Sequence, residues 1–272
     1  MKGLTCELCG SNDLVKQDGV FVCQSCNTKY SVEEAKKLMF GTRQTPAQNE
    51  ADLSNLYELA RNAKNANNNE VAKNYYAQIA KIDQNSWEAH FYNIYFEALS
   101  LYNRGYKISK FALQAESTID LTTPRVLELV QKNVNDETEQ RNAINEISDR
   151  LFYITDTFNN LSKYYYEHEL SDRLKNSDNK YVQDYVDKCY FAATILYTLG
   201  DELIAKFGDK YSDIAVKAWK KGIEYHMPLM KNFVKKEVNQ EKINGYADKI
   251  LKYDPNYERP TFKKKGLFGR FR

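Results

Sequence analysis

Apolar residues recur at helical spacing through residues 53–86, and this spacing predicts two amphipathic helices. The residues fall three or four positions apart, so each set lies on one face of a helix with 3.6 residues per turn. The first helix has Leu56, Leu59, Ala60 and Ala63, and the second has Ala72, Tyr76 and Ile79. Small side chains at Ala60 and Ala72 allow two helices to approach closely, with Tyr76 filling the space between them. We therefore expect an antiparallel helical pair, with residues 87–101 as the next helix.

A second pattern is a heptad seam in the middle of the chain. Its apolar residues alternate between spacings of three and four: Ile144, Ile147, Leu151, Ile154, Phe158, Leu161 and Tyr165. This predicts a long helix from Asp136 to about Leu170, preceded by a helix that begins at Thr123-Pro124 and ends near Val134. The seam fits an intramolecular helical hairpin, a homodimeric coiled coil, or an amphipathic face packed within its own domain.

The N-terminal residues have short apolar runs in place of helical spacing. Residues 14–17 and 20–22 can form two strands around Asp18-Gly19, a dipeptide typical of two-residue hairpin turns. Ser31 followed by Glu34 is a capping box, which predicts the start of a helix directly after the hairpin.

The end of that short helix is the first predicted domain boundary. The helix is expected to continue to Phe40, where Gly41 ends it, and residues 41–50 lack apolar periodicity. The expected organisation is a small domain at 1–40, a linker at 41–50, a helical domain at 51–258 and a tail at 259–272.

Four of the five cysteines form two closely spaced pairs, Cys6 with Cys9 and Cys23 with Cys26. Two residues between cysteines let one tight turn direct both sulfurs toward a single ion, and two such turns complete the four-thiolate shell that Zn²⁺ prefers. The thirteen residues between the pairs hold the predicted hairpin, which returns the chain to the first turn. We therefore predict one structural zinc ion bound by these four cysteines. Disulfides or a redox dithiol are the alternatives, but disulfides need an oxidising compartment and a dithiol needs only one pair.

Residues 4–40 resemble a family of bacterial zinc-ribbon proteins. The resemblance rests on Cys-x-x-Cys-Gly, a short hairpin, a second Cys-x-x-Cys and the segment Tyr-Ser-Val-Glu-Glu-Ala-Lys-Lys at residues 30–37. In such proteins a ribbon of this kind precedes helical repeats. The resemblance implies a metal that stabilises a domain too small for its own core, and a ribbon that serves as a docking module for protein or nucleic acid. It does not imply a catalytic zinc, because four thiolates leave no open coordination position.

The helical pair at residues 53–86 resembles a tetratricopeptide repeat, with Asp83-Gln84-Asn85 at the position of its usual Asp-Pro-Asn turn. A weaker match covers residues 196–225, and the segment 246–256 echoes 75–85. The resemblance implies a helical solenoid, but the matches are irregular and leave the number of repeats open. The expected fold class is therefore mainly α, with a small N-terminal β zinc ribbon before a tetratricopeptide-like solenoid or bundle.

Composition and charge narrow the expected partners. The chain has 272 residues, 42% hydrophobic and 28% charged, and a net charge of +2. Six basic residues and no acids lie at 259–272, which leaves residues 1–258 at −4. Many nucleic-acid binders bind through a broad basic surface. Residues 1–258 are net negative, so we do not expect bulk positive charge to drive their binding.

The tail itself is the one concentrated basic and aromatic segment. From Phe262 to Arg272, cations alternate with Leu and Phe, and two glycines disfavour a helix. Such a segment could contact an anionic membrane surface, stack on single-stranded nucleic acid, dock in an acidic groove, or serve as a disordered solubilising end.

The sequence contains no motif of a familiar catalytic site. It has no phosphate-binding glycine-rich loop, nucleophile elbow or HExxH helix, and nothing singles out a pair of carboxylates. His90, His168 and His226 are expected to be structural or exposed, although His168 extends the heptad seam and could be partly buried. Cys189 lies in an apolar helical stretch and is expected to be a small core residue.

We expect a cytoplasmic, non-enzymatic adaptor or scaffold that binds a protein partner through its helical body. No run approaches the 18 apolar residues of a membrane-spanning helix, and the first ten residues lack a secretory-signal pattern. The main alternative is a nucleic-acid-associated regulator that uses the zinc ribbon and the basic tail. An enzyme with an unrecognised site remains a third hypothesis.

Overall fold

The computed structural model describes residues 5–6, 8–17, 19–35, 46–105, 110–170, 180–232 and 236–260. The fold is mainly α with a small N-terminal antiparallel sheet, as the sequence predicts. The chain divides into two compact units, Met1–Asn55 and Leu56–Arg272. None of the helices among the described residues is long and apolar enough to cross a membrane. The basic tail from Phe262 to Arg272 lies outside the described residues.

The N-terminal unit is built on a three-stranded sheet of β1 (Leu14–Gln17), β2 (Val20–Cys23) and β3 (Lys29–Ser31), in that order. The predicted hairpin is confirmed: β1 pairs antiparallel with β2, with Leu14 opposite Cys23 and Gln17 opposite Val20. Gly19 in the turn has a φ of 85°, a conformation that glycine adopts without steric cost. The third strand was not predicted from the sequence, because three residues are too few to show alternation.

The predicted capping box is present at the end of β3. The Ser31 N–H donates to Glu34 Oε2 at 2.7 Å, and the Glu34 N–H donates to Ser31 Oγ at 3.2 Å. Residues 32–35 are helical. The remainder of the predicted helix, to Phe40, lies outside the described residues.

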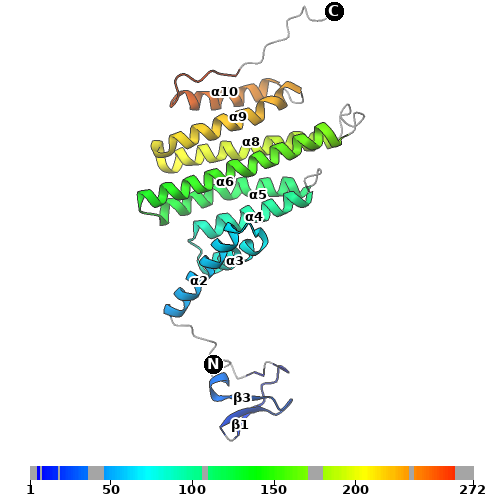
Figure 1. The fold of residues 1–272 in the computed structure, drawn as a ribbon, viewed down its shortest axis with the longest axis vertical. Coiled ribbons are helices and arrows are strands. Elements are labelled where there is room, and N and C mark those ends of the chain that lie inside the picture. The colour runs from blue at the N-terminus through cyan, green and yellow to red at the C-terminus, as the bar shows by residue number, and fades with distance from the viewer. Residues whose placement is uncertain are drawn as a thin grey trace, which may run out of the picture. The chain divides into compact units, whose positions relative to one another are not determined.

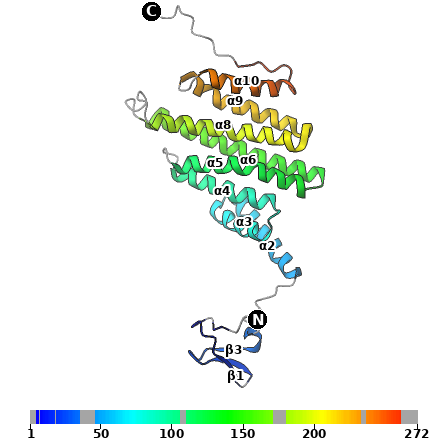
Figure 2. The same ribbon diagram turned by 180° about the vertical axis from the view of Figure 1, so that it is seen from behind.

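The C-terminal unit is a stack of helices (Figures 1 and 2). Neighbouring helices mostly pack in chain order: α3 contacts α4, α4 contacts α5, α8 contacts α9, and α9 contacts α10. Both α5 and α6 pack on α8. The helix α2 (Pro46–Asn65) begins in the first unit and ends in the second. The bounds of the other α-helices are α3 (Asn69–Ile82), α4 (Trp87–Gly105), α5 (Lys110–Asn133), α6 (Glu137–Tyr164), α8 (Lys180–Phe207), α9 (Ser212–Asn232) and α10 (Lys236–Leu251).

The helical pair predicted at residues 53–86 is formed by α2 and α3. Ala60, Ala72, Tyr76 and Ile79 are fully buried, as the pattern predicts. Leu59 is an exception, since it remains 38% exposed. The structure also corrects the linker: residues 46–50 are helical, because α2 begins at Pro46, and a proline suits the first turn of a helix.

The helix predicted to begin at Thr123-Pro124 begins earlier, so this prediction is wrong. Pro124 lies inside α5, where its missing N–H removes one backbone hydrogen bond. Threonine hydroxyls bond to nearby backbone carbonyls just before the proline: Thr122 donates to the carbonyl of Thr118 and Thr123 to that of Ile119. Side-chain bonds of this kind often bend a helix, so this part of α5 combines two local departures from regular helical bonding.

The heptad seam lies on α6, which begins after the N-cap residue Asp136 and continues past Tyr164 into a short π-helix (Tyr165–Glu169). Five seam residues have no exposed surface in the single chain: Ile144, Ile147, Leu151, Ile154 and Phe158. Since α6 packs on α8, the seam is used inside this unit. A coiled coil between two copies through these residues would require them to leave that core.

The pair formed by α8 and α9 corresponds to the weaker repeat match. A Cβ atom at Gly200 would lie 2.4 Å from Trp219 Nε1, and one at Gly222 would lie 2.7 Å from the Tyr197 ring. The two glycines therefore set how closely these helices approach. Trp219 cannot easily yield, because it is 2% exposed and donates to Asp201 at 2.9 Å.

Replacing Gly200 with alanine is expected to lower the free energy of unfolding by about 1–3 kcal/mol, because overpacking outweighs the gain in helix propensity. The matched control is Gly245→Ala in α10, where a Cβ would meet nothing within 4 Å. That variant should be neutral or up to about 1 kcal/mol more stable. Urea unfolding measures both. Equal midpoints for the two variants would contradict the close packing of α8 on α9.

Candidate metal centre

The four predicted cysteines come together on two tight turns of the N-terminal unit. Cys6 and Cys9 lie in the loop before β1, and Cys23 and Cys26 lie at the end of β2 and in the turn that follows. Each turn is closed by a backbone hydrogen bond of 2.8 Å to its first cysteine, from Gly10 to Cys6 and from Asn27 to Cys23.

Both closing residues have positive φ, 73° at Gly10 and 59° at Asn27. Glycine and asparagine are the residues that most readily adopt this left-handed conformation. The residue after each pair therefore lets the chain turn back so that both sulfurs face the same point.

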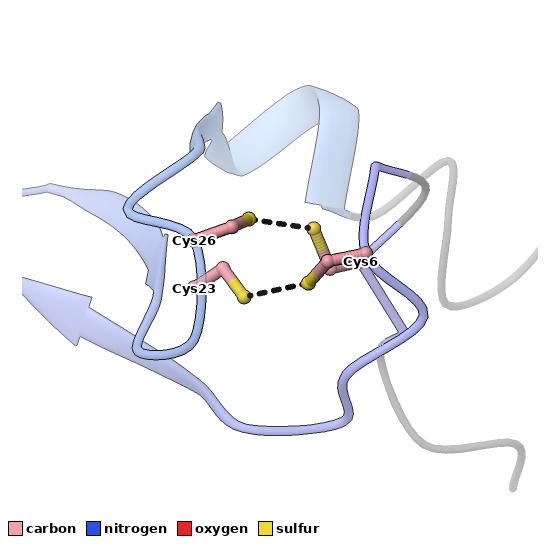
Figure 3. A group of neighbouring side chains, drawn as sticks. Cys6, Cys23 and Cys26 are labelled. Atoms are coloured by element: carbon pink, nitrogen blue, oxygen red, sulfur yellow. Dashed lines mark hydrogen bonds between the residues drawn. The ribbon is translucent and has the colours of Figure 1, made fainter.

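All four sulfur atoms lie within 4.8 Å of one another. The Sγ atoms of Cys6 and Cys26 are 3.6 Å apart, and those of Cys9 and Cys23 are 3.5 Å apart. Figure 3 shows the labelled Cys6, Cys23 and Cys26 side chains facing one another. With a zinc–sulfur distance of about 2.3 Å, the edge of a regular tetrahedron is about 3.8 Å. The cluster could therefore hold a metal ion with little movement, and none of the cysteines forms a disulfide.

Two hydroxyl groups contact the cluster. Tyr30 Oη lies 3.1 Å from Cys6 Sγ, and Thr28 Oγ1 lies 3.0 Å from Cys26 Sγ. The hydrogen bond from Tyr30 outweighs the effect of burial and lowers the pKa of Cys6 to about 6. The hydrogen bond from Thr28 lowers the pKa of Cys26 in the same way. Both contacts favour the thiolate form, which is the form that binds metals.

Neither Tyr30 nor Thr28 was predicted from the sequence as part of the site. The structure explains the position of Tyr30: it is the middle residue of β3, flanked by exposed Lys29 and Ser31, so it points inward. Three residues are too few for the sequence alone to show this alternation. Nothing in the sequence distinguishes Thr28 from an ordinary turn residue.

The core of the ribbon consists largely of the site itself. Its buried residues are Cys6, Cys23, Tyr30 and Ala35, with Leu14, Phe21 and Cys26 packed against them. So small an apolar cluster stabilises a fold weakly, which is the usual reason for a structural metal in a domain of this size.

The other singled-out cysteine and histidines lie in the helical unit. Cys189 is 2% exposed, as predicted, and burial raises the pKa of its thiol to about 12. His226 is also buried, contacting the Tyr197 hydroxyl at 3.3 Å and Asn239 Oδ1 at 2.9 Å, and burial lowers its pKa. His168 is exposed, so the seam does not extend to it as a buried position. Among the described residues, no group of three or more cysteines, histidines or carboxylates at metal-binding distance includes any of these three.

A groove between α6 and α9 is a second feature that the sequence did not indicate. It has a volume of about 640 Å³ and is lined by Phe152, Asp156, Asp213, Val216, Lys217, Lys220, Lys221 and Glu224. Most of its charges are already paired, for instance Lys221 with Asp156 at 3.4 Å and Lys220 with Asp254 at 2.6 Å. Lys217 is exposed and lies 4.4 Å above the Phe152 ring, with no ion pair among the residues that the structure describes.

Comparison with known proteins gives no further guide to the site: no protein-family model, curated protein or solved structure matches this chain. The geometry by itself shows a cluster of four cysteines at metal-binding distance, next to a three-stranded sheet and followed by a helical body.

Proposed function

We propose that the four cysteines bind one structural zinc ion. Four thiolates in tetrahedral array favour Zn²⁺ among the common divalent ions, whereas Ca²⁺ and Mg²⁺ require oxygen ligands. A shell of four protein ligands is closed, so the ion would hold the two turns and the hairpin together and would not bind substrate.

We further propose that the chain is a non-enzymatic adaptor, with the zinc ribbon as a docking module and a tetratricopeptide-like body that binds a protein partner. The observation that best supports this role is the α6–α9 groove. It offers an aromatic ring, Phe152, directly beneath an exposed cation, Lys217. This pairing suits a peptide that carries a carboxylate next to an apolar side chain. The carboxylate would contact the Lys217 ammonium, and the apolar side chain would contact the Phe152 ring.

The adaptor proposal is tested by comparing Lys217→Glu with Lys132→Glu. Both variants reverse the charge of an exposed lysine, but Lys132 lies in the last turn of α5 and not in the groove. Protein captured from the native cell extract by the unaltered chain should bind Lys217→Glu on the order of tenfold more weakly, corresponding to about 1.4 kcal/mol, and Lys132→Glu unchanged. Titration of the captured protein against each purified variant gives the affinities.

A captured protein that binds both charge-reversed variants equally would show that the groove is not the binding surface. Cys23→Ser in the same assay measures the contribution of the ribbon. The nucleic-acid alternative uses the zinc ribbon together with the basic tail, and the anionic-membrane alternative uses residues 262–272. Those residues lie outside the described part of the chain, so both alternatives stay predictions of the sequence.

A further inference from the structure

The four cysteines of the candidate metal centre differ sharply in exposure. Cys6 and Cys23 are 1% and 0% exposed and Cys26 is half-buried, whereas Cys9 is exposed. Its neighbour Leu8 is 76% exposed, and Gly10 is exposed as well. The cluster is therefore sheltered on one side and open to solvent at the turn that carries Cys9.

The hydrogen bonds to the sulfurs are distributed in the same uneven way. Cys6 has the Tyr30 hydroxyl and Cys26 has the Thr28 hydroxyl. Cys9 has a backbone hydrogen bond from Ser11, and no hydroxyl reaches it from the described residues. A donor that bonds to a thiolate ties up part of its charge, which holds the sulfur in place and makes it a weaker nucleophile.

The backbone also anchors the cysteines differently. Cys23 ends β2, opposite Leu14, and its N–H donates to the carbonyl of Thr28 at 2.9 Å. Moving Cys23 would therefore disrupt the sheet. Cys9 lies in a turn outside the sheet, next to Gly10 with its positive φ. The hydrogen bonds that hold this turn, from Gly10 to Cys6 and from Cys6 to Ser11, are separate from the strand pairing. We therefore expect that the turn can open and withdraw the Cys9 sulfur while the three strands stay paired.

We propose that Cys9 is the ligand at which the metal centre opens, so that soft electrophiles modify it first and incoming thiolates replace it first. This rests on the proposed zinc site. In alkylation, the Cys9 sulfur attacks the carbon, a sulfur–carbon bond forms, and the leaving group departs with its electron pair. The product is a neutral thioether, a much poorer zinc ligand than a thiolate. In exchange, an incoming thiolate takes the Cys9 position on the metal, and the released sulfur takes up a proton.

The experiment uses the full zinc-loaded chain and less than one equivalent of iodoacetamide, which loses iodide in the step just described. Mass spectrometry after digestion gives the modified fraction of each cysteine, and a colorimetric chelator reports zinc release in parallel. Cys9 should be modified at least about tenfold faster than Cys6, Cys23 or Cys26. The factor is taken from other metal sites, where losing a hydrogen-bond partner of a ligand changes metal affinity or activity about tenfold or more. Zinc should be released in step with Cys9 modification. Buried Cys189 is an internal reference.

Two variants test the role of the hydroxyls. Tyr30→Phe keeps the buried ring and removes the donor, so modification of Cys6 should increase about tenfold relative to the unaltered chain while Cys9 keeps its rate. Thr28→Val should have the matching effect on Cys26, and it provides a second test should Tyr30→Phe fail to fold.

Two failures are distinguishable. A zinc-loaded chain whose four ligands react at similar rates, or whose first modified residue is not Cys9, overturns this proposal and leaves the zinc site intact. A chain that retains no zinc after reconstitution, and whose cysteines react alike with and without added metal, overturns the zinc site and this proposal together.

Discussion

Removal of zinc is expected to unfold the N-terminal ribbon and to leave the helices of the second unit folded. Two of the four buried residues in the ribbon's cluster are proposed zinc ligands, Cys6 and Cys23, and the other two are Tyr30 and Ala35. Binding of a structural zinc contributes about 10–16 kcal/mol in small domains of this kind, far more than the packing of so few side chains. The helical unit, Leu56–Arg272, is a separate compact unit with its own core.

The purified chain should contain one zinc ion, and Cys23→Ser should contain none. Cys189→Ser is the matched control, because it removes a buried thiol that lies in α8 and not in the cluster. Elemental analysis gives the stoichiometry.

Amide hydrogen exchange resolves the two units after zinc is removed by a chelator. Chelation should abolish the protection of backbone amides in β1, β2 and β3, while most of the helical circular dichroism signal remains. Loss of most of that helical signal would show that the two units share a core, and full zinc retention by Cys23→Ser would refute the four-cysteine site.

The features predicted correctly from the sequence depend on residues close together in the chain. The cysteine spacing, the hairpin signal and the Ser31–Glu34 capping box each depend on only a few neighbouring residues. The structure contains the cysteine cluster, the pairing of β1 with β2 and both hydrogen bonds of the capping box. The long helix α6 was predicted for a different reason: its seam repeats over three heptads, so one irregular position does not obscure the pattern.

The features that were missed depend on contacts between distant parts of the chain. Pro124 indicates a helix start when read locally, but α5 continues through it, since the packing of α5 on α4 and α8 outweighs the local cost of the proline. Leu59 fits the apolar face of α2, yet its exposure depends on which helix lies opposite, and spacing within one helix does not contain that information.

The groove between α6 and α9 arises in the same way. Its residues belong to two helices that are separated by α8 in the chain and that both pack on α8. Tyr30 becomes an outer contact of the metal centre only because β3 pairs with β2 and returns its hydroxyl to Cys6. The sequence predicts the four cysteines of the candidate site, whereas the residues that surround them can be identified only from the fold.

Phe158→Ala is expected to lower the free energy of unfolding of the helical unit by about 3–5 kcal/mol, the range found when a buried phenylalanine is truncated. Phe158 is on the seam of α6 and has no exposed surface, so the variant leaves a cavity. For a unit of this size the loss corresponds to a decrease in melting temperature of roughly 10 °C. Tyr153→Ala is the matched control: it removes an aromatic ring from the same helix, but Tyr153 is 58% exposed. Its effect should be within about 0.5 kcal/mol.

Melting temperatures measured over a hundredfold range of protein concentration distinguish packing of the seam within one chain from a homodimeric coiled coil. Because the seam is buried within the single chain, the melting temperatures of the unaltered chain and of Phe158→Ala should not depend on concentration. A homodimer held by this seam would instead melt at a temperature that rises with concentration, since association stabilises the folded state by mass action. A concentration-dependent melting temperature that Phe158→Ala lowers or abolishes would therefore refute the intramolecular seam and favour the homodimeric coiled coil.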